Sequence, residues 1–233
     1  MSAGDLMKYT AAVVVVAVCL LTGCTPVSLT DAHITGTPKP LSFNTGERVA
    51  ALDVIAPANL QEFAPLFSNA LLAALEEADP TIRAISFQES GNLLNDRGLA
   101  ADYADLVSSF LRSGILERER LRRIGSALGS RYVLLPGVAA FDQSVIDRFD
   151  VVGLKVVRNR VTTLRLWLQL WDTKTAHNLW EATGEVTVVS QLLRVKQTVP
   201  LETIAESLWL RIIQESLLEQ QTRPQIFLRN RSQ

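Results

Sequence analysis

The segment TTLRLWLQLWDTKTAHNLWEATGEV, residues 162–186, decides the fold. Its first half alternates leucines at positions 164, 166, 168 and 170 with Arg165, Trp167, Gln169 and Trp171. Alternation with period 2 predicts a β-strand that has one apolar face and one semi-polar face. Turn residues and a second apolar stretch follow, which predicts an antiparallel hairpin. We expect strands over 160–171 and 179–189, with the leucines facing the core.

Further elements extend from this hairpin towards both ends of the chain. Strands are predicted over 47–55, 82–87 and 132–141, and helices over 66–78, 99–111, 117–128 and 198–221. The order is strand, helix, strand, two helices, a meander and a closing helix. This order predicts an α/β fold, a mixed sheet with helices packed on it, in a single domain.

Local residues mark the ends of several elements. Asn59 and Glu62 resemble a capping box. Gly129 is placed to end the helix over 117–128. Residues 88–98 have turn chemistry and are expected to form a loop. Pro136 interrupts a predicted strand, which indicates a bulge or an edge position.

The N-terminus carries an export pattern. The apolar run 11–21 is shorter than the ~20 residues that span a membrane, but it suits the apolar region of a signal peptide. Leu21-Thr22-Gly23-Cys24 resembles the bacterial lipobox, which implies acylation at Cys24 and cleavage before it. The alternative is an ordinary signal peptide with an accidental cysteine, and translation starts at either Met1 or Met7.

The resulting domain boundaries are a signal peptide over 1–23, an acylated Cys24 with a flexible tether over 24–46, the α/β domain over 47–221 and a tail over 222–233. The tether prediction rests on proline and glycine without an apolar period. The tail is either an edge strand or disordered. Two or more acyl chains hold a protein stably on a membrane. We expect the periplasmic face of the outer membrane, because Thr25 follows the cysteine where aspartate would favour inner-membrane retention.

Composition narrows the class of function. The formal net charge of −1 gives no basic footprint for nucleic acid. His33 and His177 have no third ligand at metal-like spacing, so neither a metal nor a cofactor is expected. The glycine motif over 125–130 falls at the end of a predicted helix, where it cannot cradle a phosphate. The mature chain keeps one cysteine and therefore forms no internal disulfide.

One stretch resembles a known family. The segments ALGSRYVLLPGVAAF and 162–186 resemble the TolB amino-terminal and CsgG superfamily of bacterial envelope lipoproteins. The matching positions are Leu128, Gly129, Tyr132, Val133, Leu134, Gly137, Asp172, Thr175 and Trp180. Ala176 stands where the family usually has glycine, so we expect the positive φ of the turn at Asn178 or Lys174. The resemblance implies envelope lipoproteins that bind other proteins, sometimes as rings, which allows a homo-oligomer.

Two functions from different classes follow. The first is a non-enzymatic binding or assembly module of the cell envelope, with Trp167, Trp171 and Trp180 as its candidate protein contact. The alternative for these tryptophans is core packing under the closing helix, where Trp209 would cover them.

The second function is a periplasmic hydrolase that would use Asp142, Asp147 and Asp150 on cell-wall glycan. These aspartates belong to the segment 142–159, which carries acids at both alternating sets of positions. A charge facing lipid costs up to ~2–4 kcal/mol near the midplane. We therefore expect a soluble hairpin or loop there and no transmembrane channel.

The charge run over 117–123 is expected to be a solvated helix face with mixed-sign pairs.

Overall fold

The computed structural model describes residues 30–36, 47–150, 155–191 and 199–217. Its strands are β1 (Thr30–Gly36), β2 (Arg48–Ala51), β3 (Arg83–Ile85), β4 (Tyr132–Asp150), β5 (Lys155–Asp172) and β6 (His177–Gln191). Its helices are η1 (Ala58–Phe63), α2 (Ala64–Ala78), α3 (Phe87–Asp96), α4 (Ala100–Ser113), α5 (Arg118–Leu128), α6 (Leu201–Ile212) and the π-helical turn η3 (Ile213–Leu217). Cys24 and the tail over 222–233 lie outside the described residues.

The strands form one mixed sheet in the order β1-β6-β5-β4-β2-β3. The short β2 runs parallel to β3 and β4, whereas β1, β6, β5 and β4 form an antiparallel series. Helices lie between the parallel strands along the chain, whereas β4, β5 and β6 follow one another in sequence as antiparallel neighbours. β1 joins the antiparallel series from the N-terminal end of the chain. The predicted fold class, an α/β single domain with a mixed sheet, is confirmed.

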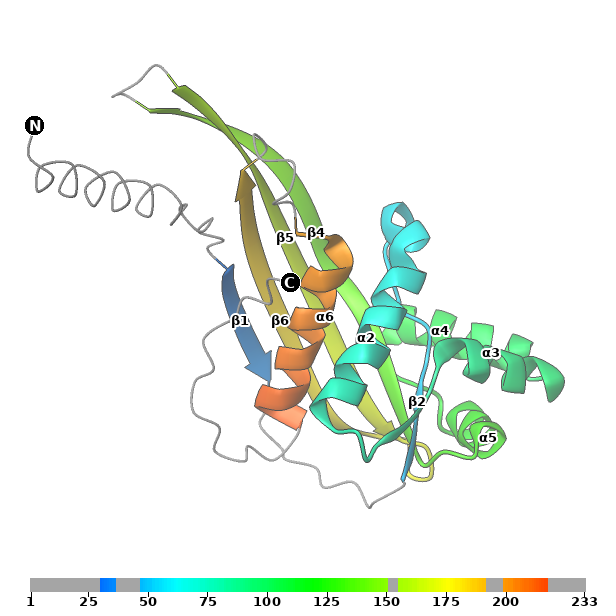
Figure 1. Cartoon of the computed structure of the whole chain (residues 1–233). Helices are drawn as coiled ribbons and strands as arrows, with labels where there is room; N and C mark the ends of the chain where they lie inside the picture. The colour runs from blue at the N-terminus through cyan, green and yellow to red at the C-terminus, as the bar shows by residue number, and fades with distance from the viewer. Residues whose placement is uncertain (1–29, 37–46, 151–154, 192–198, 218–233) are drawn as a thin grey trace, which may run out of the picture.

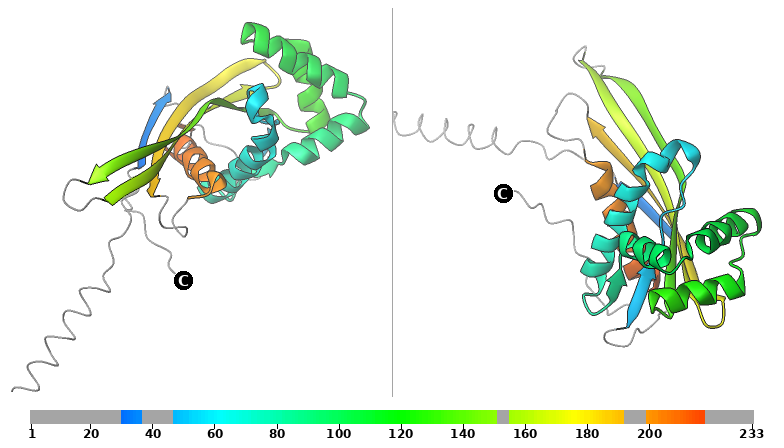
Figure 2. Two further views of the ribbon diagram at one scale, coloured as in Figure 1. Left: turned by 90° about the horizontal axis from the view of Figure 1, so that it is seen from above. Right: turned by 90° about the vertical axis from the view of Figure 1, so that its right-hand side faces the viewer.

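Helices cover both faces of the sheet (Figures 1 and 2). On one face, α2 and α6 pack over Leu164, Leu166, Leu168 and Leu170, which are all buried as predicted. The indole Nε1 of Trp209 on α6 donates a hydrogen bond of 3.2 Å to the carbonyl of Phe67 on α2 and joins the two helices. On the other face, α3, α4 and α5 cover β2 and the adjacent part of the meander in a second core.

The prediction of a loop over 88–98 was wrong, because α3 occupies most of it. The hydroxyl of Ser86 accepts a hydrogen bond of 3.1 Å from the backbone N–H of Glu89, which caps the helix. Leu94 is buried and fixes α3 on the second core. Gly91 lies within the helix and not in a turn. The expected capping box is also wrong, since η1 begins after Pro57 without a side-chain cap.

β1 corrects the prediction of a flexible tether. Thr30–Gly36 pairs antiparallel with β6, with Thr30 opposite Val188 and Gly36 opposite Ala182. The strand was missed because a seven-residue edge strand needs only one apolar side chain, here Ile34, to pack on the core. The remaining backbone of β1 is stabilised by ladder hydrogen bonds that do not depend on side-chain type.

Two local predictions concern backbone geometry in the meander. Pro136 lies beyond the end of β2, beside the single bridge between Ile55 and Gly137, and a bulge follows between Val138 and Ala140. The bulge therefore lies two residues beyond Pro136, and Pro136 itself is not at an edge, because it pairs with Leu168 and its carbonyl accepts a hydrogen bond of 2.9 Å from the Ile55 N–H. The positive φ of the β5–β6 turn was assigned to the wrong residue, because Ala176 itself has a φ of 56°.

Candidate protein-contact edge and arm

The longest hairpin of the sheet projects beyond its neighbours. β4 and β5 stay paired from Tyr132 opposite Asp172 to Asp150 opposite Lys155. The last pair between β5 and β6 is Asn159 with Gln191. We call residues 142–150 and 155–159 the arm (Figure 1). The expected hairpin or loop over 142–159 thus contains strands that continue the sheet.

Among the residues that the structure describes, no strand pairs with one side of β4 over much of its length. β2 pairs with β4 only as far as Leu134, and the bridge at Gly137 is the last contact of this kind in the described ranges. We call residues 139–150 the β4 edge. Such an edge presents backbone N–H and C=O groups that can pair with another strand. The edge is the longest unpaired strand side within the residues that the structure describes.

The arm also carries exposed apolar side chains. Val145 is 54% exposed and Ile146 is 45% exposed. Adjacent residues of a strand point to opposite faces, so both faces of the arm present an apolar side chain to the solvent. The flanking Asp142, Gln143 and Ser144 are exposed as well.

The acids proposed for hydrolysis lie along this same strand. Asp142 is exposed on β4, eight residues before Asp150. Eight residues of strand span ~26 Å, whereas the carboxyl groups of glycosidases are ~5–9.5 Å apart. Position 147 is an odd number of residues from both, and therefore belongs to the other face of the strand. The register does not bring these positions together as an acid–base pair.

The three tryptophans of the candidate contact surface are divided between the two cores. The second core contains Trp171, which is 5% exposed, and the half-buried Trp167 packs against it. The ring centroids of Trp167 and Phe110 of α4 are 5.8 Å apart. Trp180, 3% exposed, packs in the other core with Trp209 of α6. The expected grouping under the closing helix therefore applies to Trp180 alone. The alternation of strand residues predicted the shared face of Trp167 and Trp171.

The family-like motif around Asp172 shapes a turn. One carboxylate oxygen of the buried Asp172 accepts hydrogen bonds from the backbone N–H groups of Lys174 and Thr175, at 2.8 and 3.1 Å. The other accepts from Arg131, at 3.0 Å from Nε and 2.9 Å from a terminal nitrogen. Burial alone would raise the pKa of Asp172, but these hydrogen bonds outweigh it and hold the pKa below its usual value.

A glycine brings helix α5 against this turn. A Cβ atom on Gly125 would lie 2.3 Å from the Cβ of Thr173, so only glycine allows the contact. Gly129, with a φ of 60°, then ends α5 as predicted. The glycine motif over 125–130 therefore joins α5 to the β5–β6 turn.

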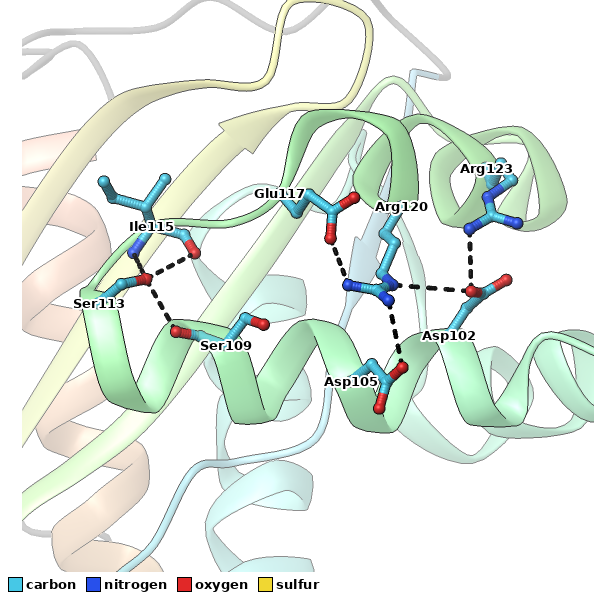
Figure 3. Close-up of polar contacts among 8 residues, drawn as sticks. All are labelled: Asp102, Asp105, Ser109, Ser113, Ile115, Glu117, Arg120 and Arg123. Carbon is cyan, nitrogen blue, oxygen red and sulfur yellow. Dashed lines mark hydrogen bonds and ion pairs between the residues drawn. The ribbon is translucent and has the colours of Figure 1, made fainter.

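Ion pairs connect α4 and α5 (Figure 3). Arg120 contacts Glu117 and lies 3.2 Å from Asp105, and Arg123 lies 2.9 Å from Asp102. These contacts confirm mixed-sign pairing in the charge run over 117–123. Leu111, near the end of α4, and Ile115, in the loop between α4 and α5, are both exposed.

A polar cluster that sequence reasoning missed lies where β2 ends. The carboxylate of Asp53 accepts a hydrogen bond of 3.3 Å from the Ser68 hydroxyl on α2. The Asp53 backbone N–H donates to the Tyr103 hydroxyl of α4 at 3.3 Å. Burial and the nearby Asp53 carboxylate raise the pKa of Tyr103 to about 12. The available clue was an acidic residue, Asp53, within the otherwise apolar run 49–55.

Two further observations concern the described ranges. They contain no group of three or more His, Cys, Asp or Glu side chains that could hold a metal ion. None of the described helices has both the length and the apolar character needed to cross a membrane.

Comparison with known proteins gives distant similarities. The sequence matches no protein-family model and no curated protein. The chain is similar to a PelC dodecamer from Paraburkholderia phytofirmans, with 14% identity, a TM-score of 0.48, and coverage of 82% of this chain and 100% of that chain. It is also similar to lipoprotein GNA1162 from Neisseria meningitidis, with 17% identity, a TM-score of 0.42, and coverage of 73% and 99%. At TM-scores below 0.5 these similarities assign no function, and the resemblance to TolB and CsgG proteins rests on the sequence motif.

Proposed function

We propose that this protein is a lipid-anchored, non-enzymatic binding module of the bacterial cell envelope, and that it binds a protein partner along the β4 edge. The observation that carries this proposal is that no described strand pairs with this side of β4 over residues 139–150. A strand edge of this length is normally shortened, covered or paired in a stable protein. Addition of a partner strand would satisfy its free backbone groups and extend the sheet.

The partner is an envelope protein or a second copy of this chain. Strand addition suits either one, because backbone hydrogen bonds provide affinity whatever the side chains are. A second copy has a matching feature, since β1 is the outermost strand on the opposite side of the sheet. β1 and β4 run in opposite directions within the sheet. Pairing β1 of one copy with the β4 edge of another would therefore continue the antiparallel series.

Acylation of Cys24 would supply the membrane attachment, with the outer membrane as the expected location. The test of this part is the variant Cys24→Ala, which should release the protein to the soluble periplasm. A variant that stays on the membrane after a high-salt wash would contradict the anchor. Cys24 precedes β1, so the substitution changes no residue of the folded domain. The folded domain of the variant is therefore the control for the loss of the anchor.

The partner site is tested by site-specific photo-crosslinking in cells. A benzophenone amino acid at the exposed position Ala140 on the β4 edge should give one adduct of defined mass, identified by mass spectrometry. The same amino acid at the exposed Ala104 on α4 is the matched control and should give none. An adduct between two copies of the chain would identify a homo-oligomer. Absence of any adduct at Ala140 in membranes that contain the anchored protein would overturn the proposed edge.

A further inference from the structure

β1 fixes which end of the domain lies near the lipid anchor. Thr30 begins β1 opposite Val188 of β6, which in turn pairs with Thr162 of β5. Thr162 pairs with Gln143, where the arm begins on β4. β1 therefore begins level with the base of the arm, as Figure 1 shows.

The distance between the anchor and β1 is short. Five residues, 25–29, separate Cys24 from Thr30. Six steps along a chain reach at most ~20 Å. The arm extends seven residues beyond the level of Thr30, from Gln143 to Asp150, which corresponds to ~23 Å. A membrane that holds Cys24 is therefore within reach of the arm whenever the Thr30 end of β1 faces that membrane.

The composition of the arm suits the headgroup layer of a bilayer. Val145 and Ile146 are exposed on opposite faces of the strand, which fits a ribbon surrounded by lipid on both sides better than one face packed on a protein. Further along, the register pairs residues of opposite charge, Asp147 with Arg158 and Asp150 with Lys155. Charged positions next to apolar ones suit the polar interface and not the hydrocarbon interior.

We propose that the arm contacts the phospholipid headgroup layer of the same membrane that holds Cys24, and that β1 sets this orientation. The inference rests on the proposed lipid anchor. The arm contact orients the domain, with the β5–β6 turn at Lys174 farthest from the membrane. Residues 139–141 of the β4 edge lie outside the arm and stay available to a partner, and they include the crosslinking position Ala140.

The test uses the full acylated lipoprotein in vesicles of phosphatidylethanolamine and phosphatidylglycerol. The environment-sensitive dye NBD is attached to the thiol introduced by Ile146→Cys, and to the thiol introduced by Lys174→Cys as the matched control at the opposite end of the sheet. Both native residues are exposed, so neither change disturbs a core. We expect a blue shift and loss of emission in vesicles with headgroup-region spin-labelled lipid for the position-146 probe, and no change for the position-174 probe.

Each outcome separates the arm contact from the anchor. If the protein floats with the vesicles but lipid does not quench the probe at position 146, the arm contact is overturned and the anchor stands. A blue shift without lipid quenching would show that a protein surface covers the arm, which also overturns the contact. Failure to float would overturn the anchor and the arm contact together. A second probe at the exposed position Ser144 should repeat the result at position 146.

Discussion

Gly137 of β4 lies directly opposite Trp167 of β5, and a Cβ atom on Gly137 would be 2.1 Å from the indole carbons Cε2 and Cζ2. Real Cβ atoms do not approach other heavy atoms so closely. Because position 137 carries no side chain, the indole lies across β4 and reaches Phe110 of α4. The cross-strand pair thereby links the meander to the second core.

We expect Gly137→Ala to destabilise the domain by about 1–3 kcal/mol, because the added methyl group forces the indole out of its position. Urea unfolding monitored by far-ultraviolet circular dichroism would measure the change. In a Trp167→Leu background the same Gly137→Ala change should cost much less, because no indole lies over position 137. Gly91→Ala is the matched control, since nothing lies within 4 Å of a Cβ there and alanine favours the helix α3 by ~0.5–1 kcal/mol. Equal stability of the two single variants would contradict the packing argument.

Ala176→Gly should stabilise the protein by about 1 kcal/mol. Ala176 has a φ of 56°, a left-handed conformation that costs an L-residue ~1–2 kcal/mol and glycine almost nothing. The midpoint of thermal unfolding would measure the gain. Ala104→Gly, on the exposed side of α4, provides the control for the flexibility of glycine and should lower stability instead. A loss at both positions would show that the turn is not strained.

The sheet could be predicted because its central strands carry a repeated pattern. Four alternating leucines, 164–170, leave one assignment for the buried face, and the structure buries all four. The same argument placed Trp167 and Trp171 together. Alternation could not reveal that helices cover the face of β5 that carries Trp167 and Trp171. The polar Arg165 and Gln169 on that face indicate contact with solvent. Trp180 lies in the opposite core because the register between β5 and β6 shifts by one residue between Leu170 and Trp171. This bulge has no sequence signature.

Other elements were missed where weak local patterns compete with tertiary contacts. α3 could have been found from Ser86 and Glu89, whose spacing is that of a helix cap, but Gly91 in the first turns favoured a loop. β1 has no periodic apolar pattern that a sequence argument could detect. Its position depends on backbone hydrogen bonds to β6, which any side chains allow. The β4 edge could not be predicted either, because it depends on how early β2 ends.

Leu166→Asp and Leu168→Asp should each unfold the domain, whereas Arg165→Asp should leave it folded. Both leucines are fully buried, and an unpaired carboxylate there costs several kcal/mol, comparable with the ~5–15 kcal/mol stability of a domain. Arg165 is exposed and pairs with Glu185 at the surface, an interaction worth ~0–1 kcal/mol. Soluble yield and circular dichroism of the purified variants would separate these cases. Similar spectra for all three variants would show that the faces of β5 are assigned incorrectly.

Asp172→Asn should destabilise the protein by about 2 kcal/mol at neutral pH, because the charged acceptor of Arg131 and of the Lys174 and Thr175 N–H groups is lost. The pKa of Asp172 is lower in the folded protein than the ~3.9 of an unfolded chain. Its contribution is therefore complete above ~pH 5 and disappears as pH falls through the folded pKa. Urea unfolding between pH 7 and pH 2 should show the two proteins converging at low pH. Asp142→Asn, at an exposed position, removes the same charge and should match the wild type throughout. A constant difference between Asp172→Asn and the wild type across this pH range would mean that the charge of Asp172 does not stabilise the turn.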